Sequence, residues 1–557
     1  MSIRPVMLAV VSALVASRGA AQRPTTIAHR STVYAPHGAI ATSQPLATAA
    51  GLDVLHRGGN AIDAAITAAA VLNVVEPMMT GIGGDLFALI WVAKEHRLVA
   101  LNASGRAGAL MTLDALLAKG HRAMPEETVE DVTVPGALLG WDELLKRYGT
   151  ITLAQALGPA IGYAEDGFPV TPIIARDWAN EAGRLRQDSG ARATFLIDGS
   201  RAPRAGEWFR NADLARTFRQ IATQGPATLY GGELGRRIVA RVRELGGYLT
   251  IEDLQRHHNE WMEPISVPFH GYRVWELPPN NQGLAVLEML RMLEPTDLRA
   301  LGHNSAAYLH RLIEAKKLAF ADLRYVGEPR AMTVPPAALL TDAYVAARRA
   351  LIDTARAADR PQPGKPVTAS ETIYLTVADS AGNMVSFINS LYDLFGSGVV
   401  VPGTGFALHD RGAGFTLEPG LPNTVAPGKR PFHTLIPGFV TQPDSAGTEQ
   451  PWMSFGVMGG SMQPQGHVQV LLNLLVFGMD LQDAIDAPRF RHLTGLRVAL
   501  EPVIGDDVRR RLAALGHVIV ADSTVTFGGA QAIQRLTGGR GYAAGSDPRK
   551  DGMAAGH

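Results

Sequence analysis

Residues 371–390 have the pattern of a β-hairpin, which constrains the fold more than any other segment. Polar or aromatic residues alternate with aliphatic ones from Thr372 to Val377, the period of a strand with two different faces. Turn-forming residues follow, among them Gly382, which can take a positive φ. With a three-residue loop, equal steps outward place Thr372 opposite Ser390. The pattern therefore predicts two hydroxyl groups facing each other at the open end of the hairpin.

The segment before this hairpin predicts a cut in the chain. Residues 355–370 contain Pro361, Pro363 and Pro366, which exclude regular structure and favour an exposed linker. A cleavage between Glu371 and Thr372 would make Thr372 an N-terminal residue. Its hydroxyl is a weak nucleophile, but the freed α-amine can act as the base that activates it. Thr and Ser are also common in strands for reasons of packing alone, and that interpretation stays open here.

The first residues predict an export signal. Arg4 gives a positive start, residues 6–16 are a short apolar run, and the small residues 19–21 precede an expected cut near Gln22. An uncleaved anchor is the alternative, although the apolar run is short for a stable membrane span. We expect a periplasmic or secreted protein, and no membrane contact after removal of the leader.

Composition narrows the classes of function. The chain has 46% hydrophobic and 19% charged residues, a formal net charge of +0 and no Cys. These values indicate a globular chain without a nucleic-acid partner, disulfides or a thiol nucleophile. The pair at 257–258 is His-His, but the ligand spacing of a zinc site is missing, so we expect surface histidines and no metal. The glycine-rich loop at 79–87 lacks the Lys-(Ser/Thr) of a phosphate-binding loop, and no cofactor is expected.

Several ordered motifs resemble the gamma-glutamyltranspeptidase family of N-terminal-nucleophile hydrolases. The hairpin matches the pattern Thr372-x-x-x-(Ser/Thr)-Val-x-x-x-x-Gly-(Asn/Ser), followed by Phe-Gly-Ser-Gly at 395–398. Further matches lie at 45–84 and 545–556, so the resemblance covers nearly the whole mature chain. It implies an α+β fold, the four-layer αββα sandwich with antiparallel sheets. The implied organisation is a signal peptide (1–21), a large subunit (22–371) and a small subunit (372–557) that form one interleaved domain after self-cleavage.

The resemblance also implies catalytic residues. Ser390 occupies the position of a second hydroxyl, usually Thr in the family, that orients the nucleophile; the hairpin spacing points to the same residue. Gly459 and Gly460 follow an expected strand at 452–455, where consecutive glycines can present two backbone N–H groups to an oxyanion. Without the resemblance, a plain turn would explain these glycines equally well.

The expected substrate pocket departs from the family pattern. Tyr392 stands where the family has an Asn that contacts glutamate, and Gly414 stands where an acidic residue binds the substrate's α-amino group. Asp410 could replace that acid, whereas Arg411 would favour an anionic substrate. Other expected substrate contacts are Arg106, near the family's carboxylate-binding Arg, and His433 with Thr434, in place of paired Ser residues. The connection at 419–428 is short, as in cephalosporin-acylase-like members, which would leave the site open to bulky substrates.

The resulting hypothesis is a self-processing enzyme that passes an acyl group from an amide, such as glutathione or another gamma-glutamyl compound, to water or an amine. An acylase with a different amide substrate is the first alternative. A non-catalytic scaffold of the same fold is the second, motivated by the altered pocket. A Ser-His-Asp hydrolase is disfavoured because no Gly-x-Ser-x-Gly elbow is present.

Overall fold

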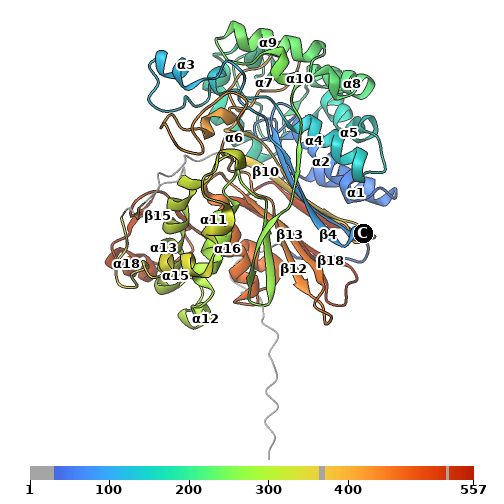
Figure 1. The fold of residues 1–557 in the computed structure, drawn as a ribbon. Helices are drawn as coiled ribbons and strands as arrows, with labels where there is room; N and C mark the ends of the chain where they lie inside the picture. Colours follow the sequence, from blue (N-terminus) through green and yellow to red (C-terminus); the bar gives the residue numbers. More distant parts are fainter. Residues whose placement is uncertain (1–29, 360, 363–370, 522–525) are drawn as a thin grey trace, which may run out of the picture.

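Two antiparallel sheets form the centre of the molecule, a computed structural model that describes residues 30–359, 361–362, 371–521 and 526–557 (Figure 1). The expected leader and most of the proline-rich linker lie outside the described residues. Among the described residues, each sheet has seven strands, and all neighbouring strands within them are antiparallel. No helix in the described part of the chain combines the length and apolar character needed to cross a bilayer.

The first sheet, called sheet I, contains the predicted hairpin at its centre. Its strands lie in the order β19 (Met553–Gly556), β2 (Ala39–Thr42), β10 (Glu371–Ala378), β11 (Met384–Tyr392), β3 (Asp85–Val92), β4 (Arg97–Ala103) and β7 (Glu260–Met262).

The second sheet, called sheet II, packs face to face against sheet I. Its strands lie in the order β1 (Val33–Ala35), β18 (Tyr542–Ser546), β17 (Gly529–Arg535), β13 (Glu449–Met458), β12 (Gly438–Pro443), β9 (Tyr272–Glu276) and β8 (Ile265–Phe269).

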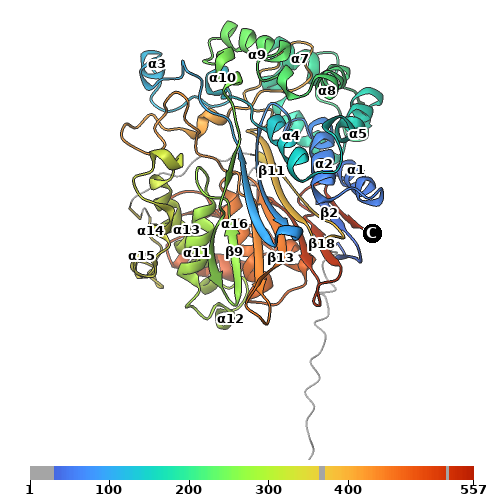
Figure 2. The same ribbon diagram turned by 45° about the vertical axis from the view of Figure 1, so that its right-hand side comes forward.

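Helices cover the outer face of each sheet, so the described chain forms the expected four layers (Figures 1 and 2). On the side of sheet I lie α1 (Pro45–His56), α2 (Ala61–Val75), α4 (Ala137–Tyr148), α5 (Leu153–Asp166) and α8 (Ala212–Gln224). On the side of sheet II lie α11 (Gly283–Leu293), α13 (Ala306–Asp322), α16 (Met462–Leu475) and α17 (Leu481–Asp486).

Strand β10 shows that sheet I has two buried apolar faces. Ile373, Leu375 and Val377 pack into the core beneath α1 and α2, whereas Tyr374 and Ala378 pack into the core between the sheets. The alternation read from the sequence therefore separates two buried faces. Every residue of α2 is buried, as its small side chains predicted.

The hairpin forms with the predicted turn. The Asp379 N–H donates to the Asn383 carbonyl over 3.1 Å, and Gly382 has a φ of 89°. Equal-step pairing holds up to Ile373 opposite Asn389. These contacts confirm the central prediction about the fold and leave one irregularity at the end of the strand, described with the site.

Candidate active site

Strand β10 lies across from β13, which fixes the surroundings of the predicted nucleophile. The Thr376 and Ser454 hydroxyl oxygens are 2.5 Å apart, and an added Cβ at Gly456 would lie 2.5 Å from the Tyr374 ring. Continuing this register by two residues places the backbone of Thr372 opposite the C-terminal end of β13. The side chains of residues 371 and 372 lie outside the described part, so the nucleophile and the cleavage site stay predictions.

The predicted glycine pair follows directly after β13. Gly459 and Gly460 have φ values of 120° and 57°, conformations that favour glycine, and α16 begins at Met462. The Gln282 side-chain amide donates to the carbonyls of Gly460 (2.8 Å) and Thr434 (2.7 Å). The pair therefore sits at a helix N-terminus and is tied to the segment that carries the predicted substrate residues. A helix N-terminus with adjacent backbone N–H groups is an arrangement that can stabilise a negative charge.

Ser390 and Tyr392 end β11 beside this position, with one departure from the predicted register. The ladder shifts by one residue between Ile373 and Glu371, and Glu371 pairs with Tyr392. Between these two pairs, Ser390 and Leu391 of β11 both face the single residue Thr372, as in a β-bulge, so the equal steps end at Ile373 and the opposition of Thr372 to Ser390 stays a prediction. The Ser390 hydroxyl oxygen accepts the Tyr392 N–H over 2.8 Å, and Tyr392 has a φ of 88°, which is uncommon for a bulky residue.

Arg411 lies fully buried on a short 3₁₀ helix, η6 (Arg411–Gly414). Its guanidinium stands over the Tyr392 ring, 4.3 Å from the ring centroid, and its Nη1 donates to the Thr434 hydroxyl over 3.2 Å. Its Nε and Nη2 have no hydrogen-bond partner among the described residues. Burial lowers the pKa of Arg411, although nearby carboxylates act in the opposite direction. The structure thus brings together three of the predicted substrate residues.

A buried network behind Arg411 was not predicted. Asp85, at the start of β3, accepts hydrogen bonds at Oδ1 from the N–H groups of Gly105 (2.8 Å) and Gly136 (3.1 Å). Its Oδ2 lies 3.2 Å from His409 Nδ1 and 3.6 Å from His433 Nε2, and all three side chains are fully buried. The predicted residue His433 is therefore part of a carboxylate–imidazole cluster.

The charges of this cluster are coupled to Arg411. Burial alone would raise the pKa of Asp85, but His409, His433 and Arg411 together hold it below its ordinary value, so Asp85 is a carboxylate. Burial, with the Arg411 charge, lowers the pKa of His433 well below its ordinary value, so its imidazole is neutral near pH 7. The cluster therefore holds one negative and one positive charge in a site shielded from water.

The structure also explains why residue 414 is glycine. A Cβ at Gly414 would lie 2.2 Å from the Phe432 carbonyl oxygen, so the backbone here leaves no room for any side chain. The neighbouring acid Asp410 is buried and accepts the Asp393 N–H over 3.2 Å. Burial, followed by the repulsion between the two carboxyl groups, raises the pKa of Asp393, and burial raises that of Asp410.

Arg106 lies in a separate ion-pair cluster. Its Nη2 is 2.7 Å from Glu260, its Nη1 pairs with Glu328, and the neighbouring Arg430 shares Glu260 at 2.9 Å. These bonds occupy its guanidinium with protein partners, and no hydrogen bond or ion pair among the described residues joins it to Arg411. Its role at the substrate stays a prediction.

The expected surface position of His257 is wrong. Its ring is buried and stacks on Tyr230 with a centroid distance of 5.3 Å, and burial lowers its pKa to about 3. His258 is exposed, as expected. Nothing local in the sequence indicates that Tyr230 covers one of the two rings.

Among the described residues, only His310, Glu314 and His517 are grouped closely enough to hold a metal ion. These atoms already have protein partners. His310 Nε2 lies 2.7 Å from the Asp353 carbonyl oxygen, and Glu314 accepts from Lys317 Nζ over 2.8 Å. The group therefore fits a structural polar cluster better than a metal centre.

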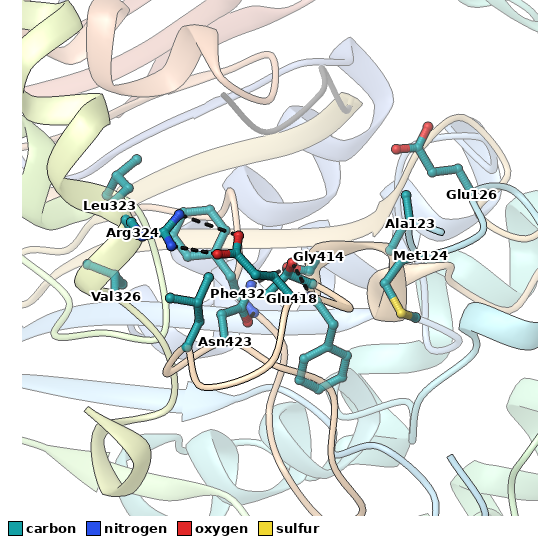
Figure 3. Close-up of a pocket in the computed structure, with 14 residues that line it drawn as sticks. Ala123, Met124, Glu126, Leu323, Arg324, Val326, Gly414, Glu418, Asn423 and Phe432 are labelled. Atoms are coloured by element: carbon teal, nitrogen blue, oxygen red, sulfur yellow. Dashed lines mark hydrogen bonds and ion pairs between the residues drawn. The ribbon is translucent and has the colours of Figure 1, made fainter. Parts of the chain in front are cut away.

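A cavity of about 250 Å³ opens beside η6 (Figure 3). Gly414 and Phe432 line it, and the ion pair of Arg324 with Glu418 (2.6 Å) crosses one side. Because Gly414 and Phe432 directly neighbour the Arg411 and His433 segments in sequence, the cavity lies next to the candidate site. Its lining is mixed, with apolar residues such as Met124 and polar ones such as Glu418.

A sequence model of the gamma-glutamyltranspeptidase family matches residues 47–557. The chain belongs to the gamma-glutamyltranspeptidase family. A glutathione hydrolase-like proenzyme of Bacillus subtilis is 37% identical over 522 residues, covering 92% of this chain and 97% of the relative. An oxamate amidohydrolase proenzyme of Klebsiella pneumoniae is 37% identical over 538 residues, covering 94% and 98%.

Solved structures agree on the fold. The crystal structure of a cephalosporin acylase from Bacillus halodurans is 46% identical, with a TM-score of 0.89, and the match covers 96% of this chain and 98% of that one. The expected α+β sandwich of N-terminal-nucleophile hydrolases is thereby confirmed. The chain is an enzyme of the gamma-glutamyltranspeptidase family, which argues against the scaffold alternative. The names of its relatives cover different amide substrates, so the family does not by itself identify the substrate.

Proposed function

We propose that this protein is a self-processing amidohydrolase of the acylase type, with Thr372 as its nucleophile. The observation that supports the proposal is the register of Thr376 and Tyr374 against β13; continued by two residues, it puts Thr372 opposite the end of β13, directly before Gly459 and Gly460. A nucleophile and an oxyanion site are the two parts that acyl transfer from an amide requires.

The reaction begins with cleavage of the precursor. One water hydrolyses the amide between Glu371 and Thr372: the C–N bond breaks, the water oxygen becomes part of the Glu371 carboxylate, and Thr372 gains a free α-amine. In each turnover, the Thr372 hydroxyl oxygen attacks the substrate carbonyl while the α-amine takes up its proton. Ser390 orients the hydroxyl group.

The intermediate then collapses to an ester. Backbone N–H groups of Gly459 and Gly460 stabilise the oxyanion; a single donor of this kind contributes about 3–4 kcal/mol in other enzymes. The C–N bond breaks and the leaving amine departs with the proton from the α-amine. Water attacks the acyl-Thr372 ester, which releases the acid and restores the hydroxyl group. An amine in place of water would give transfer instead of hydrolysis.

The pocket supports an acylase in preference to a glutathione hydrolase. A γ-glutamyl donor carries an α-ammonium group, and a buried ammonium group needs an anionic partner. The backbone around Gly414 excludes a side chain at the position where the family has that partner.

Hydrolysis of γ-glutamyl compounds is the second candidate. Asp410 and Asp393 lie next to Arg411, and one of them could accept an ammonium group once ionised. The relative named glutathione hydrolase-like also favours it.

The decisive variant is Thr372→Ala, examined by denaturing electrophoresis with intact-mass analysis. The wild type should give two fragments, the smaller one beginning at Thr372, and should turn over an amide substrate. Thr372→Ala should stay one chain without turnover, whereas the matched control Thr368→Ala should process normally. A Thr372→Ala protein that still cuts itself or turns over substrate would refute the mechanism.

A further inference from the structure

Three consecutive amide side chains are buried in the turn between β9 and α11. Asn280, Asn281 and Gln282 are each at most 1% exposed. A buried amide is costly unless its donors and acceptors find hydrogen-bond partners. The partners of these three side chains therefore indicate what the turn contributes to the molecule.

The first two amides build the turn and attach it to neighbouring backbone. The Asn281 side chain bonds to the turn itself, at the Pro278 carbonyl (2.7 Å) and the Gly283 N–H (2.8 Å). The Asn280 side chain donates to the Pro431 carbonyl over 2.5 Å. The turn is thus internally fixed and is attached to the segment that leads into the predicted substrate residues.

Gln282 differs from its neighbours because its amide group joins two segments of the candidate site. Its Nε2 donates to the Thr434 carbonyl over 2.7 Å and to the Gly460 carbonyl over 2.8 Å. An amide nitrogen carries two N–H donors, so both are used. The Gln282 backbone N–H also donates to the His433 carbonyl over 3.2 Å. Gln282 therefore bridges the segment 433–434 and the glycine pair.

The glycine pair depends on outside contacts for its conformation. Gly459 and Gly460 both have positive φ values, and glycine has little conformational preference of its own. The Gly459 carbonyl accepts the Met462 N–H over 3.0 Å, which fixes the peptide plane between the two glycines. In a planar trans peptide the N–H points opposite to the C=O, so this bond directs the Gly460 N–H away from α16.

The bond from Gln282 fixes the next peptide plane. The Gly460 carbonyl accepts the Gln463 N–H over 3.1 Å together with the Gln282 amide. With the planes on both sides of its Cα held, the backbone angles of Gly460 are set. Met462 and Gln463 belong to the helix that follows the pair, whereas Gln282 ties the pair to a different segment of the site.

We propose that Gln282 is a positioning residue of the oxyanion site, which holds the Gly460 N–H at a fixed place relative to the segment 433–434. This inference rests on the proposed amidohydrolase function and on its oxyanion site. Gln282 acts through the backbone of Gly460 and does not touch the substrate. Its loss should therefore slow acyl transfer and leave substrate binding nearly unchanged.

The first test is the variant Gln282→Met, which keeps a long unbranched side chain but has no donor. Glutaryl and γ-glutamyl p-nitroanilide serve as amide substrates, and kcat is calculated per processed chain. For the faster substrate, kcat should fall roughly 10–100-fold while KM stays within about threefold of the wild type. The control Gln220→Met, which removes a bond of 3.0 Å to Thr228 beside α8, should keep both constants. An unchanged kcat in Gln282→Met would overturn the proposal.

The variant Gln282→Glu separates positioning from a general loss of packing. A protonated carboxyl group can donate one hydrogen bond to a carbonyl, whereas a carboxylate donates none and repels both carbonyl oxygens. Burial beside two carbonyl groups raises the pKa of the new carboxyl group. The ratio of its kcat to that of the wild type should therefore rise roughly tenfold or more as the pH falls from 8 to 5.

The same ratio for Gln282→Met should not change with pH, since methionine does not titrate. Division by the wild-type value removes the titration of the Thr372 α-amine, which all variants share. A ratio for Gln282→Glu that is low and independent of pH would contradict a positioning role. Because this variant is close to glutamine in shape, it keeps the test valid if Gln282→Met misfolds.

The wild type and Thr372→Ala separate this inference from the proposed function. If the wild type turns over no amide, or if Thr372→Ala is as active as the wild type, the proposed mechanism fails and the positioning role fails with it. If the wild type is active and Thr372→Ala is not, but Gln282→Met keeps the wild-type kcat, only the positioning role fails.

Discussion

Replacing Asp85 with Asn removes one of two opposite charges buried at the candidate site. The amide keeps an oxygen for the N–H groups of Gly105 and Gly136, so the change removes charge with little change of shape. Arg411 then loses the buried carboxylate that acts on it most strongly. Breaking a buried charge pair by removing one partner costs about 3–5 kcal/mol.

This cost converts into a measurable shift of the melting temperature. With an unfolding entropy of about 2.1 cal/mol/K per residue, a chain of 557 residues should lose roughly 3–4 °C. Differential scanning fluorimetry at one fixed scan rate measures the shift. Asp507→Asn, an exposed carboxylate paired with Arg511, is the control and should leave the melting temperature unchanged.

A double variant tests the reasoning directly. In Asp85→Asn with Arg411→Met, both charges are absent, so most of the lost stability should return while substrate turnover stays low. The expected interaction energy is about 1–3 kcal/mol. If the double variant melts at the temperature given by adding the two single shifts, the charges are not coupled and the explanation is refuted.

Two further changes test the packing of the site. In Asp393→Asn, a carboxyl group whose pKa is raised by burial and by Asp410 becomes neutral at every pH. Because a raised pKa gives stability that is lost as the pH rises, the variant should gain melting temperature over the wild type, and the gain should grow from pH 5 to pH 9; a gain that shrinks with pH would contradict the assigned direction. In Gly84→Ala, the new Cβ would lie 2.2 Å from the Ser390 carbonyl oxygen, so the variant should melt lower and lose turnover. Gly158→Ala, where nothing lies within 4 Å of the new Cβ, is its control in α5 and should melt no lower than the wild type.

The hairpin was predictable because its signals are local. Side-chain alternation and turn residues act over a few positions, and the ladder from Ile373 to Ala378 follows them. The shift near Thr372 was not predictable, since it depends on how the strand end meets segments far away in sequence. The same limit explains His257, whose burial depends on Tyr230.

In the candidate site, too, local patterns were predictable from the sequence and contacts between distant segments were not. The glycine pair after β13 was found because a strand followed by two glycines is a local pattern, and the resemblance gave it a role. The contact between Asp85 and His409 was not predicted, because the two residues are 324 positions apart in the sequence. Only the folded arrangement of the strands brings them together. Arg411 was recognised as a candidate, but its unpaired edge is visible only in three dimensions.

The interleaving of strands has a consequence for the life of the mature enzyme. Both sheets contain strands from before and after residue 372: β2 and β3 flank the hairpin in sheet I, and β1 and β9 flank the later strands in sheet II. After the proposed cut, neither fragment holds a complete sheet. The precursor therefore folds as one chain, whereas the unfolded mature enzyme could refold only if its two fragments associate. Self-cleavage thus makes refolding a bimolecular reaction that depends on protein concentration. The lifetime of the active enzyme is then set by its unfolding rate.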